Sequence, residues 1–538
     1  MRNGCTSWPD EAIDRYTAAG YWSEATFATL GRETAARDPG RVAVASAGLR
    51  LTYGQLDRDV SQVAAGLRSL GLCAGDCVVV QLGNQPEFVV ASLALFRIGA
   101  VPVYALPAHR RVEVQYLSRT ANAVAYIAPA CDGGFDYRDL ARELLGSGGV
   151  RHAILTGDAA ELTSFDALWH GDLDSRAGAP APVDPGEVAF FLLSGGTTGL
   201  PKLIPRTHRD YMYQLRESAA ALRFDASSAY LAALPVAHNA ALGCPGVLGA
   251  LLAGGRVVLA TSPSPDEAFP LIEAERVTHT TLMPPILSLW VELHDVFGTD
   301  LGGVVLQVGG AKLPPELATR AIETFGSPFT HWFGMAEGLL TYTRLNDPAE
   351  VVVHTAGRPL SPDDEIRIVD ASGDDVAPGE IGELLTRGPY TLRGYYRADD
   401  HNARSFTSDG FLKTGDLCRR TSRGDLVIEG RIKDVINRGG EKVSAPEVEE
   451  HLLEHPAVRQ VALVAIADRA MGEKTCAVVV SRGACPSLRE LREFLKQRGL
   501  ADYKLPDRVV ERDTLPHTSV GKIDKRAIRA TLEQADAA

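Results

Sequence analysis

The stretch from Ser194 to Lys202 reads Ser-Gly-Gly-Thr-Thr-Gly-Leu-Pro-Lys and has the composition of a phosphate-binding loop. Glycines let an anion approach the backbone closely, so that N–H groups and the hydroxyls of Thr197 and Thr198 can donate hydrogen bonds to it. Lys202 adds a positive charge at the end of the loop. The Gly-Lys-[Ser/Thr] spacing of a Walker A loop is absent. Taken alone, such a loop is more often a surface turn.

Six further segments contain glycine and polar residues that could complete a site. They are Leu-Pro-Val-Ala-His-Asn at 234–239, Val-Gly-Gly-Ala-Lys at 308–312, Phe-Gly-Met-Ala-Glu-Gly at 333–338, Lys-Thr-Gly-Asp at 413–416, the stretch 430–442, and Pro-His-Thr-Ser-Val-Gly-Lys at 516–522. In an open α/β sheet, ligands bind beyond the carboxyl ends of the strands. Because most of these segments are strand-to-loop junctions, we expect them to meet at one site.

The elements that would position these segments alternate between helices and short apolar strands. Helices are predicted at 53–70, 88–98 and 112–120, and strands at 77–81, 101–104 and 124–127. The alternation resumes with strands at 188–193, 230–233, 256–259, 279–282, 304–308 and 330–333. This pattern predicts an α/β fold of doubly wound sheets with helices on both faces.

The pattern changes after about residue 360. Strands at 365–369 and 383–387 alternate polar and apolar residues, which predicts a small β-rich part at about 361–432. Helices at 445–453, 487–498 and from 524, with strands near 461–466 and 476–480, predict a C-terminal α+β domain at 433–538. The N-terminal core, 1–432, would contain two α/β layers at about 45–180 and 181–360, joined by the proline-rich stretch 171–186.

Length and composition restrict the class of protein. The chain has 538 residues, enough for several domains, and its 45% apolar and 23% charged content is that of a globular protein. The net charge of 55 − 68 = −13 argues against a nucleic-acid partner. No signal peptide and no membrane-spanning run are expected. The eight cysteines include no Cys-x-x-Cys pair, so we expect reduced thiols and a cytoplasmic location.

Taken together and in this order, the segments resemble those of the adenylate-forming superfamily, which includes acyl-CoA synthetases, luciferases and peptide-synthetase adenylation domains. The closest resemblance is to stand-alone aryl acid–AMP ligases of the 2,3-dihydroxybenzoate and salicylate type. It covers nearly the whole chain and is carried by the runs 195–208, His238-Asn239, 333–338 and 437–443. The resemblance implies a two-step reaction with ATP and Mg²⁺. A carboxylate attacks the α-phosphate and releases pyrophosphate, and the acyl group then passes to a phosphopantetheine thiol or to coenzyme A.

The resemblance also implies roles for individual residues. Lys522 would bridge the substrate carboxylate and the phosphate, Glu337 would bind Mg²⁺, and Asp416 would accept hydrogen bonds from the ribose. His238 is a further catalytic candidate, with a structural histidine as the alternative. The other ATP-binding candidates are Ser194, Gly195, Gly196, Thr197, Thr198, Gly199, Lys202, Gly309, Gly310, Ala311, Gly334, Met335, Ala336 and Arg431.

The resemblance to the adenylate-forming superfamily also implies that the C-terminal domain is mobile. Lys433 resembles the hinge of the superfamily, about which the last domain rotates. One orientation would bring Lys522 to the adenylate. The other would bring Gly439, Gly440 and Lys442 to the tunnel through which the thiol arrives.

The identity of the acid is suggested by the residues after His238. In the aryl-acid ligases the next residue, here Asn239, contacts an ortho hydroxyl. Cys244 suits salicylate-type acids, because a thiol is a weak hydrogen-bond donor. Ala240 and Ala241 replace the aromatic residue and proline that the family usually has, which predicts a wider pocket. A substituted salicylate or a hydroxynaphthoate would fit, and 3-hydroxypicolinate is also compatible. By analogy, the pocket also includes Gly309 and Leu340.

Two alternatives remain open. An aryl acid–CoA ligase would differ only in the thiol acceptor, and a non-catalytic nucleotide-binding protein could retain the fold. No carrier domain is recognisable before Ala538, so a carrier is expected to be a separate protein in siderophore or antibiotic biosynthesis.

Overall fold

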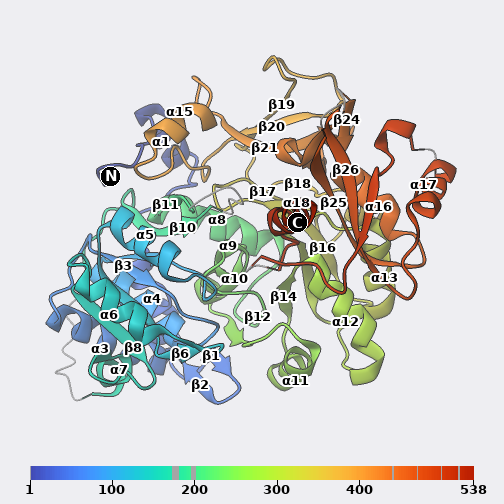
Figure 1. Cartoon of the computed structure of the whole chain (residues 1–538). Coiled ribbons are helices and arrows are strands. Elements are labelled where there is room, and N and C mark those ends of the chain that lie inside the picture. The colour runs from blue at the N-terminus through green and yellow to red at the C-terminus, as the bar shows by residue number, and fades with distance from the viewer. Residues whose placement is uncertain are drawn as a thin grey trace.

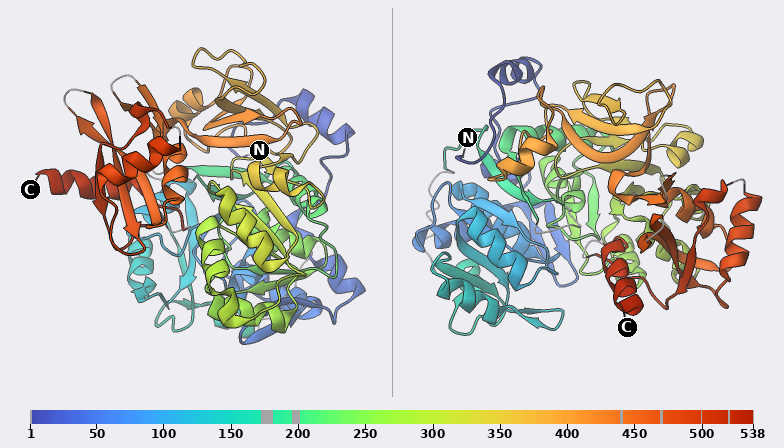
Figure 2. Two further views of the ribbon diagram at one scale, coloured as in Figure 1. Left: turned by 90° about the vertical axis from the view of Figure 1, so that its right-hand side faces the viewer. Right: turned by 45° about the horizontal axis from the view of Figure 1, so that its top comes forward.

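The computed structural model describes residues 2–171, 181–194, 201–438, 441–468, 471–498, 500–518 and 521–537. Two large, mostly parallel sheets lie next to each other, with a four-stranded antiparallel sheet beside them (Figure 1). A five-stranded sheet forms the C-terminal part, which stands out from the rest in both views of Figure 2. The predicted α/β fold class, with a β-rich part and a small α+β C-terminal part, is thereby confirmed.

The first large sheet has seven strands. Their order is β11 (Leu203–Thr207), β10 (Val188–Leu193), β4 (Val101–Tyr104), β3 (Cys77–Val80), β5 (Ala123–Pro129), β8 (His152–Thr156) and β9 (Thr163–Ser164). All neighbours are parallel except β10 and β11, which form an antiparallel pair. Helices α5 (Arg111–Ala121) and α6 (Tyr137–Gly146) pack on this sheet.

The second large sheet has nine strands. Their order is β18 (Arg358–Pro359), β17 (Leu340–Tyr342), β16 (Phe329–Gly334), β15 (Val305–Gly309), β14 (His279–Leu282), β12 (Ala229–Ala232), β13 (Arg256–Leu259), β1 (Val42–Ser46) and β2 (Leu49–Thr52). The strands from β16 to β1 are parallel, and the outer strands at both edges are antiparallel.

The two sheets exchange strands, and this is a correction to the predicted layers. Strands β1 and β2 join the second sheet although they precede the strands of the first sheet in the chain, whereas β10 and β11 join the first sheet. The layers therefore do not divide at about residue 180. Apolar runs identify strands, but they do not reveal which of two similar sheets a strand joins.

Helix α4 (Pro86–Ile98) lies in the buried layer between the sheets. Every residue from Phe88 to Ile98 is buried, and Phe88 belongs to one hydrophobic cluster with β1, β3 and β12 residues. A helix that is apolar on all sides needs such a fully buried place. Next to it, α3 (Tyr53–Ser69) begins at a capping box, in which Thr52 and Gln55 satisfy each other's backbone N–H groups.

One side chain links the two sheets just before α4. The Asn84 amide nitrogen donates to the carbonyl oxygens of Ala232, Leu234 and Ala260, each at 2.9 Å, at the ends of β12 and β13. Its oxygen accepts from the Val236 N–H, also at 2.9 Å. The end of β12, which leads to His238, is therefore held by Asn84, which lies between β3 of the first sheet and α4.

The remaining strands form the two smaller sheets. The antiparallel sheet is β19 (Glu365–Val369), β20 (Gly382–Arg387), β21 (Leu412–Arg420) and β22 (Leu426–Arg431). The C-terminal sheet is β24 (Glu441–Ser444), β23 (Val435–Arg438), β26 (Gly472–Ser481) and β25 (Val458–Asp468), with β27 (Arg508–Glu511) beside β26. Helices α16 (Ala445–Leu453), α17 (Leu488–Gln497) and α18 (Lys525–Ala537) complete this part. In the described part of the chain, no helix has the length and apolar character needed to cross a membrane.

The C-terminal part contacts the nine-stranded sheet region near the predicted site. Lys312, just after β15, forms an ion pair with Glu450 of α16 at 2.5 Å. Close by, a side chain placed on Gly521 would lie 3.9 Å from the sulfur of Met283, at the start of α12 (Pro284–Phe297). These contacts bring the segment of Lys522 to the carboxyl ends of the parallel strands.

Candidate active site

The described ends of the predicted phosphate loop are joined as a hairpin. Ser194 donates its N–H to the Lys202 carbonyl at 3.0 Å, and its hydroxyl accepts from the Lys202 N–H at the same distance. These bonds extend the β10–β11 pair by one step. The candidates Gly195, Gly196, Thr197, Thr198 and Gly199 lie outside the described residues.

The loop after β16 is held by a buried arginine from β11. The Arg206 guanidinium donates to the carbonyl oxygens of Ala336, at 2.8 Å, and Tyr390, at 3.1 Å. Its charge is balanced by Asp210, one turn into α8 (His208–Ala221), at 2.9 Å. Removing one partner of such a buried pair would leave the other charge buried without a counter-charge. Arg206 therefore acts as a positioning residue for the segment that contains Gly334, Met335, Ala336 and Glu337.

Glu337 lies among a tyrosine and two further charged residues. Its Oε1 accepts a hydrogen bond from the Tyr395 hydroxyl at 2.9 Å. Desolvation raises the pKa of Glu337, while the hydrogen bond from Tyr395 and the positive charge of Arg431 oppose the rise, and Asp416 adds to it. Glu337 and Asp416, predicted for different parts of ATP, are therefore close enough to influence each other.

Asp416 and Arg431 form an ion pair across the β21–β22 ladder. They are directly opposed in register, and the Arg431 Nε lies 2.6 Å from the Asp416 Oδ1. Asp416 is buried, and its backbone N–H is fixed by the Thr414 hydroxyl at 3.0 Å. The Arg431 side chain is 40% exposed and the Asp416 side chain 4%, so the ion pair reaches from the interior to the surface.

His238 and Lys522 face the same space from opposite parts of the chain. His238 is the residue before α9 (Asn239–Gly243), and its Nδ1 accepts from the Ala240 N–H at 3.3 Å. Desolvation, together with the positive charge of Lys522, lowers the pKa of His238 to about 4, so the imidazole is neutral at pH 7. Lys522 is exposed and lies in a small hairpin, with its N–H on the Thr518 hydroxyl at 3.2 Å.

Among the described residues, the Asn239 side chain has three hydrogen-bond partners, of which Tyr211 is the nearest. The Tyr211 hydroxyl donates to its Oδ1 at 2.7 Å, which fixes the amide. Its Nδ2 donates to the Cys244 sulfur, a weak acceptor, and to the Met335 carbonyl, where the contact is long, both at 3.4 Å. The amide N–H₂ group can therefore turn to a better acceptor on a ligand. Burial raises the pKa of the Cys244 thiol to about 12, so it remains protonated.

The wall opposite α9 is formed by strands β15, β16 and β17. Gly309 pairs with Trp332, and Gly334 pairs with Leu340, so that these residues share one sheet face. A Cβ on Gly309 would lie 2.7 Å from the Trp332 ring, and one on Gly334 would lie 2.2 Å from Leu340. The two glycines are required by this packing. Gly310 has a positive φ of 76°, which glycine adopts most easily, and Ala311 is exposed.

Ala240 and Ala241 are buried in the same hydrophobic cluster as Trp332. Their exposed fractions are 2% and 0%, and the cluster also contains Cys244, Met283, Leu340 and Tyr342. The indole of Trp332 thus contributes aromatic volume beside the two alanines. The sequence interpretation considered only the volume lost on the helix side, and it missed Trp332 on the sheet side.

Four residues of the site were not singled out from the sequence: Arg206, Tyr211, Trp332 and Tyr395. Arg206 lies within the quoted run 195–208, and Trp332 precedes Gly334 by two residues on the same strand face, so a period-of-two reading could have found it. Tyr211 and Tyr395 carry no local signal, because their roles depend on tertiary contacts with Asn239 and Glu337.

The predicted hinge and thiol tunnel are described only in part. Lys433 lies in a short 3₁₀ turn, Ile432–Asp434, directly after β22, and Lys442 lies in β24. Gly439 and Gly440 lie outside the described residues. The roles of these four residues remain predictions.

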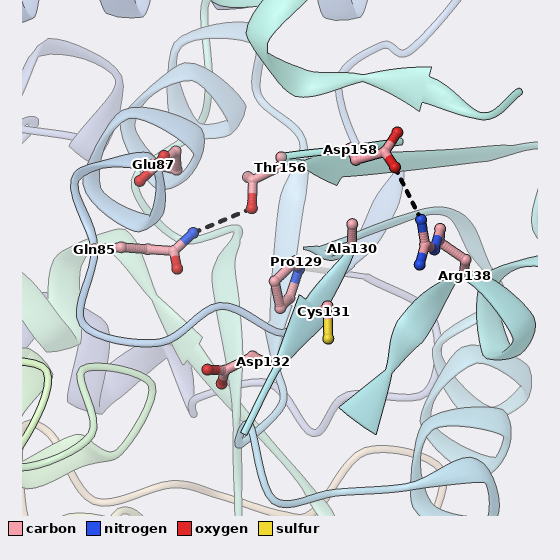
Figure 3. A pocket seen from close by; sticks show the side chains of 10 residues that line it. Gln85, Glu87, Pro129, Ala130, Cys131, Asp132, Arg138, Thr156 and Asp158 are labelled. Carbon is pink, nitrogen blue, oxygen red and sulfur yellow. Dashed lines mark hydrogen bonds and ion pairs between the residues drawn. The ribbon is translucent and has the colours of Figure 1, made fainter. Parts of the chain in front are cut away.

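A separate hollow lies on the seven-stranded sheet. It has a volume of about 450 Å³ and is shown in Figure 3, with Gln85 hydrogen-bonded to Thr156 and Arg138 paired with Asp158. It is lined by Gln85, Glu87, Pro129, Ala130, Cys131, Asp132, Arg138, Thr156, Gly157 and Asp158. None of the predicted site residues is among them.

The arrangement can bind a nucleotide and an acid next to each other. Carboxylates and cations (Glu337, Asp416, Arg431) lie on one side, and a neutral, mostly apolar wall (Asn239, Cys244, Trp332) lies on the other. Among the described residues, no three His, Cys, Asp or Glu side chains are grouped to hold a metal. Mg²⁺ is commonly held by one or two carboxylates together with substrate phosphates, and the half-buried Glu337 carboxylate fits that pattern.

Comparison with known proteins identifies relatives over almost the full length. The AMP-binding enzyme family matches residues 31–396, and the AMP-binding enzyme C-terminal domain matches residues 447–522. The 2,3-dihydroxybenzoate-AMP ligase of Bacillus subtilis is 49% identical over 536 residues, which are 99% of this chain and 98% of that protein. The salicyl-AMP ligase / salicyl-S-ArCP synthetase of Mycobacterium tuberculosis is 47% identical, over 98% and 94%. An apo structure of Mycobacterium smegmatis MbtA superposes with a TM-score of 0.77 at 48% identity, covering 98% of both chains.

Proposed function

The chain belongs to the AMP-binding enzyme family, and from this premise we propose that it is an aryl acid–AMP ligase for a 2-hydroxyaryl carboxylic acid. The acid's carboxylate oxygen attacks the α-phosphorus of ATP, and the bond to pyrophosphate breaks. A phosphopantetheine thiol of a separate carrier protein then attacks the acyl carbon, and AMP leaves. ATP and free thiols are both maintained in the cytoplasm, where this reaction would take place.

The proposal rests on one observation, a chain of neighbours at the carboxyl ends of parallel strands: the charge of Lys522 acts on His238, and the amide of the next residue, Asn239, reaches the carbonyl of Met335, two residues before Glu337. Lys522, near His238, would bind the negative charge that develops between carboxylate and phosphate. The neutral His238 would not compete with Lys522 for that charge. Asn239, oriented by Tyr211, would donate to the ortho oxygen of the acid.

The nucleotide side would hold ATP through Asp416 and Glu337. Asp416, paired with Arg431, would accept hydrogen bonds from the ribose hydroxyls. Glu337, oriented by Tyr395, would hold Mg²⁺ against the polyphosphate, where the ion neutralises phosphate charge. The loop between Ser194 and Lys202 would supply N–H and hydroxyl donors to the same phosphates.

The proposal is tested by ATP–pyrophosphate exchange with benzoate, salicylate, 2,3-dihydroxybenzoate, 3-hydroxypicolinate and 2-hydroxy-1-naphthoate. We expect exchange with at least one 2-hydroxyaryl acid and little with benzoate. A transfer assay with a carrier protein and with coenzyme A then decides between a carrier-dependent ligase and a coenzyme A ligase. ATP binding without exchange for any acid would favour the non-catalytic alternative and overturn the proposal.

A further inference from the structure

Trp332 carries a buried hydrogen-bond donor that has no partner. The residue is 4% exposed, and its indole nitrogen neither reaches water nor meets an acceptor in the described part of the chain. An N–H left in this state is costly, and native proteins contain few of them. Two other buried tryptophans are satisfied, since Trp22 donates to Pro389 at 3.1 Å and Trp290 donates to Pro263 at 2.8 Å.

The place of this donor distinguishes it from the other unpartnered indole. Trp169 also lacks a partner, but it lies in α7 (Phe165–His170), away from the predicted site segments. The Trp332 nitrogen lies 2.7 Å from where a Cβ of Gly309 would be, at the carboxyl end of β15. The same ring belongs to the cluster of Ala240 and Cys244, on the wall that faces α9.

Helix α9, which carries Ala240 of this cluster, begins with another donor, Asn239. The Asn239 oxygen accepts from Tyr211, and its N–H₂ group donates to the Cys244 sulfur and the Met335 carbonyl at 3.4 Å, contacts that an acceptor on a ligand would replace. The Cys244 thiol is protonated and a weak donor. Two N–H donors beside an apolar cluster are complementary to an acid that has two acceptor atoms besides its carboxylate. An ortho oxygen would satisfy Asn239, which leaves one acceptor for Trp332.

We propose that Trp332 is a specificity-determining residue, whose indole N–H donates to a second acceptor atom on the aromatic ring of the acid. This inference rests on the proposed function and names its substrate class, which is 2-hydroxyaryl acids with a ring nitrogen or a ring-bound ether oxygen. A carbocyclic acid of the same shape leaves the N–H unpaired. A site built to hydrogen-bond a substrate atom discriminates strongly against the analogue that lacks it.

The test compares matched acids that differ in one acceptor. The ring-nitrogen pairs are 3-hydroxypicolinate with salicylate, and 3-hydroxyquinoline-2-carboxylate with 3-hydroxy-2-naphthoate. The ether pair is 2-hydroxy-3-methoxybenzoate with 2-hydroxy-3-methylbenzoate. For one type of pair, we expect kcat/KM in pyrophosphate exchange to favour the acceptor acid by roughly 3- to 30-fold. The type that shows the preference identifies the acceptor as a ring nitrogen or an ether oxygen.

The Trp332→Phe variant removes the donor and retains an aromatic ring. We expect its preference ratio to fall to about 1, with the activity lost mainly on the acceptor acid. The matched control is Trp290→Phe, which removes a satisfied N–H from α12, outside the site, and should lower the melting temperature while leaving the ratio unchanged.

Three outcomes are decisive. A wild-type protein that shows no preference within any pair overturns the inference, even if Trp332→Phe does not fold. A preference that survives Trp332→Phe also overturns it, because another group must then recognise the acceptor. If no acid supports exchange, the proposed function itself is wrong. If both acids of every pair support exchange equally, only the inference about Trp332 is wrong, so the two failures can be told apart.

Discussion

The nucleotide side and the acid side of the candidate site are built from different chemistry. On the nucleotide side, Glu337, Asp416 and Arg431 are charged, and each is held by a partner at 2.6 to 2.9 Å. On the acid side, Asn239, Cys244 and Trp332 are neutral, the amide of Asn239 reaches the Met335 carbonyl only at 3.4 Å, and the Trp332 N–H has no acceptor among the described residues. The nucleotide side is therefore arranged before any ligand binds. On the acid side, hydrogen-bond donors remain for which the fold provides no good acceptor. The comparison shows that selectivity for a ligand can come from such donors.

The largest expected effect concerns the group that joins the two sides. Lys522→Ala should reduce pyrophosphate exchange by about 100- to 1000-fold, because a preorganised charge at the reacting atoms is lost. ATP affinity, measured by calorimetry, should change little. Lys496→Ala, on α17 and paired with Asp502, is the control and should retain activity. Unchanged exchange in the Lys522 variant would contradict the assigned role.

The next largest effect should be a loss of protein stability together with a rise in KM that is greater for the acid than for ATP. Gly309→Ala places a Cβ 2.1 Å from the Trp332 carbonyl oxygen and 2.7 Å from its ring, so the wall of the acid side must move. We expect the free energy of unfolding to fall by about 1–3 kcal/mol and the KM for the acid to rise more than the KM for ATP. Gly303→Ala, where a Cβ meets nothing within 4 Å, should be neutral in thermal unfolding. Equal rises in both KM values would argue against two separately built sides.

The pH dependence should come from the nucleotide side alone. Burial raises the pKa of Glu337, so activity that needs its carboxylate should fall as the pH drops through that raised value. Tyr395→Phe removes a hydrogen bond that favours the ionised form, so the acid limb of kcat/KM for ATP should move to higher pH. Tyr126→Phe, whose hydroxyl donates to Gln81 at 2.6 Å in the first sheet, should not move it. A shift to lower pH in the Tyr395 variant would refute the assignment.

The smallest expected effect is a change of preference on the acid side. Cys244→Ser replaces a weak donor 3.4 Å from Asn239 with a hydroxyl. The kcat/KM ratio of 2,3-dihydroxybenzoate to salicylate should rise by about 2- to 10-fold. Cys485→Ser, in the C-terminal part, should leave the ratio as it is. A falling ratio would mean that Cys244 does not face the ring position next to the ortho hydroxyl.

The sequence predicted the elements better than their assembly. Strands such as Val101–Tyr104 and Arg256–Leu259 begin and end as predicted, because each is a short, mostly apolar run between clear breaks. The membership of β1 and β2 in the second sheet was missed, since apolar patterning does not encode which sheet a strand joins.

The candidate site divides in the same way. Glu337, Asp416 and Lys522 could be singled out because they lie in ordered motifs of distinctive residue types. The period of two along β16 could have placed Trp332 beside Gly334, but a tryptophan in an apolar strand is normally a core residue, and its unpartnered N–H becomes visible only with the neighbouring strands in place. Arg206 likewise acquires its role only when it reaches the Ala336 carbonyl across the fold.

The four hydrogen bonds of Asn84 limit how this chain can be re-engineered. The acid preference could be changed by replacing residues 234–245 with a relative's segment. Such a graft would leave Asn84 behind, although its amide, which comes from the chain segment of the first sheet, holds the end of β12. A grafted segment with a different backbone path at Val236 would lose the hydrogen bond from the Val236 N–H to Asn84, which fixes the position of His238 and Asn239. Specificity is therefore not a detachable module in this fold, and a working chimera would have to exchange the Asn84 loop together with the segment it holds.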